Sequence, residues 1–155
     1  MPTIRHALPE EAGILGEFRL RMFRSMGVAD DARLSALASV QDPWTRQALT
    51  DGRMTGLVAE SDGEVVGALQ IAWVDLPPSL RDLRGRKAYL LGLYVVPAAR
   101  QGGVARALVE RAIEEARAGG VELITLHASD AGRPLYEKLG FEPTSEMRLL
   151  TSAGR

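Results

Sequence analysis

The sequence predicts one mixed α/β domain of three layers, in which a mixed central β-sheet of about six or seven strands is flanked by about four helices. Two observations carry this prediction. β-Rich runs alternate with helical stretches along the whole chain. A chain of 155 residues also suits one domain with a full core and is too short for two ordinary domains. Residues 1–155 are therefore expected to form a single domain.

The first elements are expected to be a short strand and two helices. Thr3–Arg5 is predicted as the strand. The first helix is predicted to start at Pro9, because proline fits the first helical position and acidic residues follow it, and to end at Gly27. The second helical stretch, Asp30–Leu49, is expected to break near Pro43, because proline has no N–H for the helix ladder.

A β-hairpin and a central strand are expected next. Met54–Glu60 and Glu64–Val74 are strand-like, and the Asp-Gly pair within Ser61-Asp62-Gly63 is typical of a tight hairpin turn. The stretch Asp75–Lys87 contains two prolines and several arginines and is predicted to be a surface loop. The almost unbroken apolar run Tyr89–Val96 suits a strand that is covered on both faces.

The last third of the chain is expected to contain a helix, a strand, a short helix and a final strand. Gly103–Ala118 has apolar residues at helical spacing and charged residues on the opposite face. Val121–His127 is β-rich, and Ala131–Leu139 is a short helix that a glycine ends. Phe141–Leu150 is predicted to be the last strand.

The composition argues against several classes of function. The 19 basic and 20 acidic residues give a formal net charge of -1, which argues against nucleic acid or a membrane surface as a partner. No apolar run reaches the about 18 residues of a spanning helix, and the start of the chain lacks a signal-peptide core. The chain has no cysteine, and His6 and His127 belong to no metal-binding pattern, so no metal is expected. A cytoplasmic location is the expectation.

The segment Arg100–Arg106 is the most informative for function. It connects a predicted buried strand to an amphipathic helix, and it contains Gly102 and Gly103, whose lack of a side chain lets a ligand approach the backbone. Unpaired N–H groups at the start of the helix favour an anion such as phosphate. The alternative is a plain turn. The sequence has neither a P-loop nor a dinucleotide-binding fingerprint.

The context of this segment resembles a known family. The string YLLGLYVVPAARQGGVARALVERA resembles the acetyl-CoA-binding motif of the GNAT superfamily of N-acetyltransferases, with Arg100, Gly103 and Ala105 in the matching places. Further on, LYEKLGF, which ends at Phe141, resembles the second signature of the superfamily. The order of predicted elements matches the GNAT fold over nearly the whole chain, and HASDAGRPLYEKLGF looks especially like bacterial members.

The resemblance implies acetyl-CoA as co-substrate. The thioester arm would lie beside the backbone of the central strand, an N–H near Val95 would polarise the thioester carbonyl, and the loop would wrap the pyrophosphate. Arg106 would reach a phosphate or, alternatively, pair with Glu110 on the helix surface. The implied cofactor-binding residues are Leu93, Tyr94, Val95, Arg100, Gln101, Gly102, Gly103, Val104, Ala105, Arg106 and Ser129.

The resemblance also implies a catalytic residue. Tyr136 would donate a proton to the departing thiolate of CoA, the alternative being a core tyrosine that holds the last helix. Ile124 stands where some members carry a glutamate base, which leaves the general base open. His127 is one candidate, with the capping of the following turn as its structural alternative, and Glu60 is another. Leu135 and Phe141 are interpreted as packing residues.

By the same resemblance, the acceptor enters between the first two helices and the loop after the hairpin. The residues that these segments offer are Arg19, Met22, Phe23, Arg24, Trp44, Trp73 and Tyr89. An apolar floor with arginines suits an amine that also bears a carboxylate, whereas Asp30 and Asp31 suit a cationic amine. Ordinary core packing with solvated arginines is the third interpretation, and the three stay open.

The leading hypothesis is therefore an acetyl-CoA-dependent N-acetyltransferase that moves an acetyl group directly to a primary amine, of a small molecule or a peptide. The absence of cysteine agrees with direct transfer in a ternary complex. The alternatives are a non-catalytic acetyl-CoA-binding module that acts as a sensor and an interaction domain without a CoA site. Dimers are common in the superfamily, which leaves a homodimer open, although no residue of the sequence demonstrates one.

Overall fold

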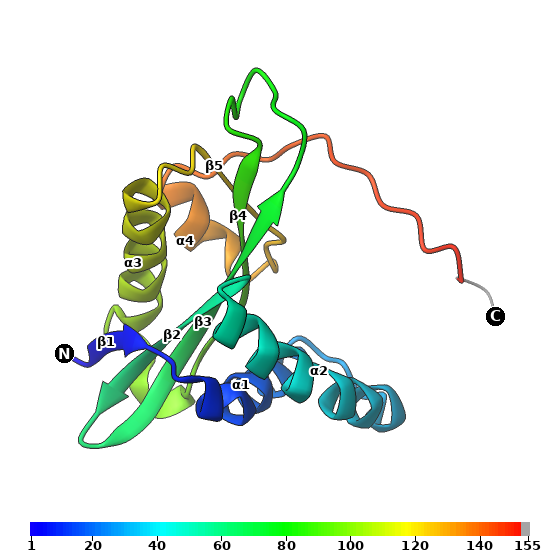
Figure 1. The fold of residues 1–155 in the computed structure, drawn as a ribbon. Coiled ribbons are helices and arrows are strands. Elements are labelled where there is room, and N and C mark those ends of the chain that lie inside the picture. The colour runs from blue at the N-terminus through cyan, green and yellow to red at the C-terminus, as the bar shows by residue number, and fades with distance from the viewer. Residues whose placement is uncertain (153–155) are drawn as a thin grey trace.

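The computed structural model describes residues 1–152 and arranges them in three layers, with a central sheet between helices (Figure 1). In chain order the elements are β1 (Thr3–His6), η1 (Pro9–Glu11), α1 (Ala12–Ser25), α2 (Asp31–Asp51), β2 (Met54–Ser61), β3 (Glu64–Asp75), β4 (Arg86–Val95), η2 (Pro97–Ala99), α3 (Val104–Ala118), β5 (Leu123–Leu126) and α4 (Arg133–Lys138). The predicted mixed α/β fold class is confirmed.

The sheet has five strands in the order β1-β2-β3-β4-β5. The first three pairings are antiparallel, whereas β4 and β5 are parallel and pair from Lys87↔Leu123 to Leu90↔Leu126. β5 ends at Leu126, while β4 continues to Val95. All of β5 therefore pairs with the first half of β4, and within residues 1–152 the second half of β4 has no strand beside it on that side.

Two groups of buried side chains hold the layers together. On one face of the sheet, Leu57, Leu69 and Ile71 pack against Leu108 and Val109 of α3, and all five are fully buried. On the other face, side chains of α1 pack against β2 and β3. The buried residues of this second cluster are Ala7, Leu15, Phe18, Val58 and Ala68. The sheet is thus covered on both faces, as the apolar run in the central strand predicts.

A β-bulge at Gly92 changes which side chains of β4 face α3. Gly92 has a φ of +69°, and an added Cβ would lie 2.9 Å from the side-chain amide of Gln70. Leu90 and Val95 belong to the same core cluster, although an odd separation would place them on opposite faces of a regular strand. The register shift opposite Ala68–Gln70 supplies the extra residue. Tyr89 lies before the bulge, between Ala88 and Leu90 of the same cluster, so alternation turns its side chain toward α1.

The predicted break at Pro43 is wrong, because α2 runs through this residue from Asp31 to Asp51. A proline inside a helix costs about 3 kcal/mol. Packing on both sides offsets this cost: Leu34 lies buried before the proline, and Thr45 and Ala48 lie buried after it. The helix therefore keeps its course because tertiary contacts hold both halves.

The predicted last strand at Phe141–Leu150 is also wrong. Residues 142–150 form no regular secondary structure, and they run away from the body of the molecule (Figure 1). The last backbone hydrogen bond that the described residues donate near this end joins the Phe141 N–H to the Tyr136 carbonyl at 3.0 Å. A strand requires a ladder partner, and the single chain supplies none here. The sheet consequently has five strands instead of the six or seven expected.

Candidate functional site

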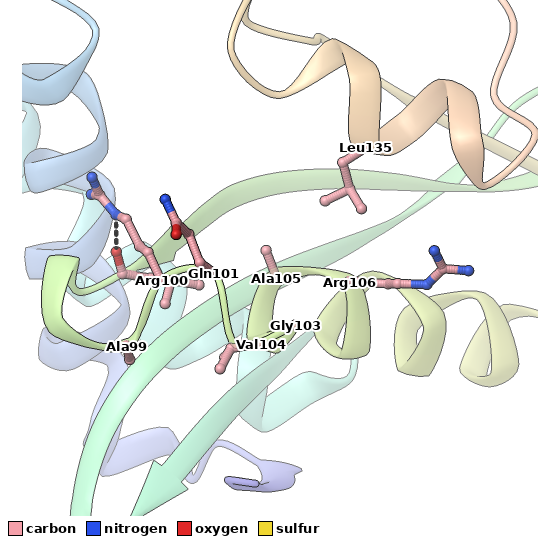
Figure 2. Close-up of a pocket in the computed structure, with 9 residues that line it drawn as sticks. Ala99, Arg100, Gln101, Gly103, Val104, Ala105, Arg106 and Leu135 are labelled. Carbon is pink, nitrogen blue, oxygen red and sulfur yellow. Dashed lines mark hydrogen bonds between the residues drawn. The ribbon is translucent and has the colours of Figure 1, made fainter.

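A pocket of about 270 Å³ opens beside the end of β4, where β5 no longer accompanies it. The Val96 N–H donates to the Val66 carbonyl of β3 at 2.9 Å, so alternation along the strand points the backbone of Val95 to the opposite side, into the gap. Figure 2 shows the loop and the first turn of α3 on one side of the pocket and α4 above it. The lining residues are Val95, Ala99, Arg100, Gln101, Gly103, Val104, Ala105, Arg106 and Leu135.

The backbone of this loop presents a row of unpaired donors. Gln101 and Gly103 adopt left-handed conformations with φ of 66° and 81°, and the first bond of the helix ladder runs from the Ala107 N–H to the Gly103 carbonyl at 3.0 Å. Within residues 1–152, the amides of residues 101–106 donate no hydrogen bond. Consecutive free amides at a helix N-terminus form a concave site for an anion such as phosphate.

Gly67 on β3 allows the helix to start this close to the sheet. A Cβ at this position would lie 3.2 Å from Cγ1 of Val104 and 3.2 Å from Cδ1 of Leu108. Both residues are buried in the core between the sheet and α3. The packing of α3 therefore fixes the position of its first amides relative to the gap beside β4.

Both arginines of this segment, Arg100 and Arg106, form hydrogen bonds within the protein. Nε of Arg100 donates to the Val95 carbonyl at 2.9 Å, and its guanidinium lies 5.3 Å from the centre of the Tyr94 ring. Nε of Arg106 donates to Glu110 at 2.9 Å, which is the helix-surface pair that the sequence left as an alternative. Because this pair is half exposed, it contributes little to stability. A phosphate contact by either arginine stays a prediction.

The short helix α4 forms the other wall of the pocket. Leu135 lines it, so this residue does more than pack, whereas Tyr136 lies half-buried next to it with its ring 5.7 Å from that of Phe141. Burial raises the pKa of Tyr136 above its ordinary value, which keeps the phenol protonated. Its oxygen makes no hydrogen bond to another described residue. A buried neutral phenol is suited to donate a proton.

Ser129 serves the start of α4. Its Oγ accepts a hydrogen bond from the Gly132 N–H at 3.1 Å, and its carbonyl accepts one from the Arg133 N–H at 2.9 Å. Ser129 therefore closes the turn that His127 was a candidate to cap. The hydroxyl proton remains free to donate, so a cofactor contact of Ser129 stays a prediction.

His127 instead pairs with Tyr89 on the α1 side of the sheet. The Tyr89 phenol oxygen lies 2.5 Å from Nδ1 of His127, and Nε2 of His127 lies 3.8 Å from a carboxylate oxygen of Glu146. Burial raises the pKa of Tyr89, and the nearby Glu146 raises it further, whereas Arg19 opposes the shift. The structural alternative for His127, a turn cap, is therefore wrong, and the residue belongs to a polar group of side chains.

Two polar atoms near Tyr89 have no partner. Nε of Arg19 on α1 and Oγ1 of Thr125 on β5 are buried and make no hydrogen bond to the described residues. Thr125 is the register partner of Tyr89, and the charge of Arg19 acts on Tyr89. Burial lowers the pKa of Arg19. Within residues 1–152 no carboxylate forms an ion pair with Arg19, and its guanidinium lies 5.4 Å from the centre of the Phe23 ring.

The structure separates other residues of the expected acceptor region. Trp73 lies on the α3 face of the sheet, opposite Tyr89, and its Nε1 donates to Thr55 Oγ1 at 2.9 Å. Trp44 is half exposed and lies under Arg53, at 5.0 Å. Met22 and Phe23 are half-buried, whereas Arg24 is exposed. A second cavity of about 320 Å³ is lined by Asp51, Gly52, Arg53, Trp73, Asp75 and Arg86.

The acidic candidates have structural roles. Asp30 caps α2, because its carboxylate accepts from the Arg33 N–H at 3.0 Å, and Asp31 is exposed in the first turn of that helix. Glu60 pairs with Arg5 at 2.8 Å, and Arg5 also pairs with Glu11 at 2.8 Å. Glu60 thus ties β1 to β2, and a role for it as general base stays a prediction.

Two site residues were missed in the sequence. Ala99 lines the pocket beside the loop, and Glu146 faces His127. Ala99 has no chemical signature, and Glu146 falls in a segment that was predicted to be a regular strand. No sequence signal marked either one. Ile124 packs half-buried in the core against α3, so β5 supplies no carboxylate at this position.

Among residues 1–152, no three side chains of a metal-ligating type gather into a cluster. The helices of that part of the chain are too short or too polar to cross a bilayer.

Solved structures define the class of this fold. The crystal structure of a GCN5-related N-acetyltransferase from Ralstonia eutropha JMP134 is 30% identical, with a TM-score of 0.91, and the match covers 97% of this chain and 98% of that one. A predicted acetyltransferase from Clostridium acetobutylicum, solved with acetyl-CoA, is 27% identical with a TM-score of 0.86, and the match covers 97% of this chain and 96% of that one. The fold is that of an acetyltransferase.

The sequence agrees with this class. The profile of the acetyltransferase (GNAT) family matches residues 21–141, and the chain belongs to this family, which confirms the resemblance of its two motifs. YhfO, described as an uncharacterised N-acetyltransferase of Bacillus subtilis (strain 168), is 34% identical over 90 residues, which are 56% of this chain. That match spans 57% of the length of the Bacillus protein.

Proposed function

We propose that this protein transfers the acetyl group of acetyl-CoA to the primary amine of a small molecule, by direct attack while both substrates are bound. The observation that carries the proposal is the row of unpaired amides at residues 101–106 beside the gap of β4. The acetyl-CoA in the Clostridium relative supports the choice of co-substrate. A nucleotide with two linked phosphates fits donors of this kind.

The backbone of this chain does most of the binding. The amides of residues 101–106 would hold the pyrophosphate, and the pantetheine arm would lie along the unaccompanied half of β4, beside Leu93, Tyr94 and Val95. The Val95 N–H points into the gap and would donate to the thioester oxygen, where negative charge develops during attack. Preorganised donors of this kind need no rearrangement during the reaction.

Two tyrosines would transfer the protons of the reaction. The amine nitrogen forms a bond to the carbonyl carbon, and the carbon–sulfur bond then breaks. Tyr136 would protonate the leaving thiolate, for which its raised pKa keeps the proton in place. Tyr89 would take the proton of the attacking amine as its own phenol proton passes to Nδ1 of His127. His127 is well exposed, with 61% of its side chain accessible, and can pass the proton to water.

The acceptor is proposed to carry an anionic group as well as its amine. Arg19 is partly buried and forms no ion pair with a carboxylate of residues 1–152, and its charge lowers the pKa of Tyr89. A carboxylate on the substrate would neutralise this guanidinium and supply the missing partner of its Nε. The competing idea, a cationic acceptor at Asp30 and Asp31, has less support because Asp30 already caps α2.

Calorimetric titration with acetyl-CoA is the first test, with ATP and NADH as controls. Saturable binding of acetyl-CoA alone is expected, and its absence would overturn the acetyltransferase proposal. Release of CoA is then measured with matched amines, such as phenylalanine and 2-phenylethylamine, which differ by one carboxylate. We expect kcat/KM to favour the carboxylated member by about 10-fold to 100-fold, and Arg19→Met to abolish the preference. Equal rates would refute the anionic acceptor and leave acetyl transfer intact.

A non-catalytic acetyl-CoA-binding module is the alternative. The observation that favours it is Ile124, a half-buried aliphatic residue at the position where some GNAT members carry a base. Such a module would bind acetyl-CoA in the titration and release no CoA with any amine. The same two experiments therefore separate the alternatives, and an interaction domain without a CoA site would bind no acetyl-CoA at all.

A further inference from the structure

Gln70 on β3 carries a buried carboxamide that the fold itself does not use. Only 3% of the residue is exposed, and within residues 1–152 its side chain makes no hydrogen bond. Gln41 on α2 differs, because it is 6% exposed and its Nε2 donates to the Gly16 carbonyl at 3.1 Å. A buried amide without a partner destabilises the folded state, whereas an apolar side chain of the same length would not. Packing alone therefore does not explain a glutamine at this position.

Gly92 on β4 makes room for the amide of Gln70. A Cβ at Gly92 would lie 2.9 Å from Nε2 of Gln70 and 3.5 Å from its Cδ, so a larger residue would press against the amide. Gly92 follows Leu90 by two residues, and Leu90 is the last residue of β4 that pairs with β5. The amide therefore lies over the part of β4 where the gap between the two strands begins.

The side chain of Gln70 projects from the face of the sheet that packs against α1. Ala68 belongs to the buried cluster on that face, whereas Leu69 and Ile71 belong to the cluster on the α3 face. Because side chains alternate along a strand, Gln70 faces the same way as Ala68. The amide thus lies on the side of the sheet where the acceptor is proposed to bind.

Other polar groups without a partner lie on the same face. Tyr89 is the diagonal neighbour of Gln70 across β3 and β4, and such neighbours lie about 7–8 Å apart. Thr125 on β5 is the register partner of Tyr89, and its Oγ1 has no partner. Nε of Arg19 on α1 has none either, and the charge of Arg19 opposes the rise that burial causes in the pKa of Tyr89. Polar groups of three elements around one tyrosine indicate a polar ligand, because buried polar groups are normally paired.

The sheet is incompletely covered next to these groups. Ala72 is the register partner of Tyr89 and is only half-buried, although it carries no more than a methyl group. Tyr89 and Leu91, which lies opposite Gln70, are half-buried as well. α1 therefore leaves part of this row of side chains accessible, and a small molecule can reach the face from which Gln70 projects.

We infer that Gln70 binds the acceptor and that the acceptor is an α-amino acid. A carboxamide offers two N–H donors and a carbonyl oxygen, so Oε1 accepts a hydrogen bond from the amine while Nε2 donates to the carboxylate next to it. Arg19 balances the charge of that carboxylate. The inference rests on the proposed acetyl transfer and adds to it the class of acceptor and a residue that recognises it.

Thermal melts without any substrate test whether the fold uses the amide. Gln70→Met removes the polar atoms and keeps the length of the side chain, so the melting temperature should be unchanged or higher. Gln41→Met is the matched control, because it leaves the Gly16 carbonyl without its donor and should lower the melting temperature by about 2–4 °C. An equal fall in Gln70→Met would mean that the amide has a structural role, and the inference would fail.

Steady-state kinetics test the contact with the acceptor. The probe is the fastest acceptor in a panel of α-amino acids and their decarboxylated amines, including phenylalanine and 2-phenylethylamine, at saturating acetyl-CoA. Gln70→Met should raise the KM for the amino acid about 10-fold, because a hydrogen-bonding group that binds substrate is lost. The kcat and the Kd for acetyl-CoA should change by less than about threefold. Gln41→Met should leave this KM unchanged.

The outcomes distinguish this inference from the proposed function. If the wild type releases CoA with an amino acid and Gln70→Met has the same KM, the role of Gln70 is refuted and acetyl transfer stands. If the decarboxylated amines are the faster acceptors, the α-amino acid is refuted as the class of acceptor. If the wild type releases no CoA with any member of the panel, acetyl transfer fails and this inference fails with it.

Discussion

The phenol oxygen of Tyr89 on β4 lies 2.5 Å from Nδ1 of His127, which follows β5. Tyr89 stands one residue before the last paired position of these strands, so the hydrogen bond joins β4 to the end of β5 just where the two strands separate. The charges of Arg19 and Glu146 shift the pKa of the same phenol in opposite directions, Arg19 lowering it and Glu146 raising it. The contact therefore lies on the face of the sheet that packs against α1, next to the gap that opens beside β4.

Tyr89→Phe and His127→Gln should both slow the reaction if this pair accepts the proton of the amine. Each is expected to lower kcat/KM by about 100-fold while the Kd for acetyl-CoA stays within a factor of two or three. The measurement is initial-rate kinetics with the amine found in the screen, together with calorimetry. The double variant should be no slower than either single one, because the two residues act in one relay; additive losses would contradict the relay.

Tyr136→Phe should affect chemistry and spare binding. Removal of the phenol oxygen leaves the ring to pack against Phe141, so acetyl-CoA binding and the melting temperature should be unchanged, whereas kcat falls by about 100-fold. Because burial raises the pKa of Tyr136 above its ordinary value, any alkaline decline of the wild-type kcat caused by this residue should have its midpoint above pH 10. A parallel loss of acetyl-CoA affinity would instead assign Tyr136 a binding role.

Gly103→Ala should weaken acetyl-CoA binding by more than its cost in stability explains. Gly103 has a φ of +81° and Gly52 a φ of +80°, so alanine at either position should cost about 1 kcal/mol in the free energy of unfolding. Gly52 lies at the end of α2, far along the chain from the amide row. Calorimetry and thermal melts should therefore give equal destabilisation and a loss of affinity in Gly103→Ala alone. Equal affinities would remove the loop from the binding site.

The ion pairs of Arg5 should make stability depend on acid pH. The hydrogen bond from Arg5 lowers the pKa of Glu11 below its ordinary value, so the stabilisation is fully present above pH 4.5 and is lost as the pH falls through the folded-state pKa. Glu11→Gln is expected to cost about 0.5–1 kcal/mol at pH 7, because Arg5 is partly exposed. The melting temperatures of the variant and the wild type should converge below pH 4.5, once Glu11 is protonated in the folded protein as well. A difference that persists there would point to packing instead of charge.

Local signals in the sequence predicted the elements around the pocket beside β4. The two glycines and the apolar spacing place the start of α3 within one residue of the observed Val104. The Asp-Gly pair likewise places the turn between β2 and β3. These features depend on backbone geometry and on periodicity over a few residues, which a sequence displays directly.

The predictions that failed concern segments whose structure depends on contacts with residues far away in the sequence. The fate of residues 142–150 depends on a ladder partner, which periodicity does not reveal. Pro43 is tolerated because remote packing holds both halves of α2. The register of β3 and β4 pairs Trp73 with Ala88 and Ala72 with Tyr89, so Trp73 and Tyr89 lie on opposite faces of the sheet, which divides the expected acceptor region. The partner of His127 was missed because a strand pairing brings Tyr89 to it.

A ligand site built from main-chain amides has its own pattern of sensitivity to substitution. An alanine in place of Val104 or Arg106 would leave every amide in place, so side-chain scanning would underestimate this loop. A proline at each position would instead delete a single donor, and the first turn of α3 accepts proline without loss of a ladder bond. A proline scan through this turn would therefore rank the donors one by one, and relatives with different side chains here can keep the same ligand.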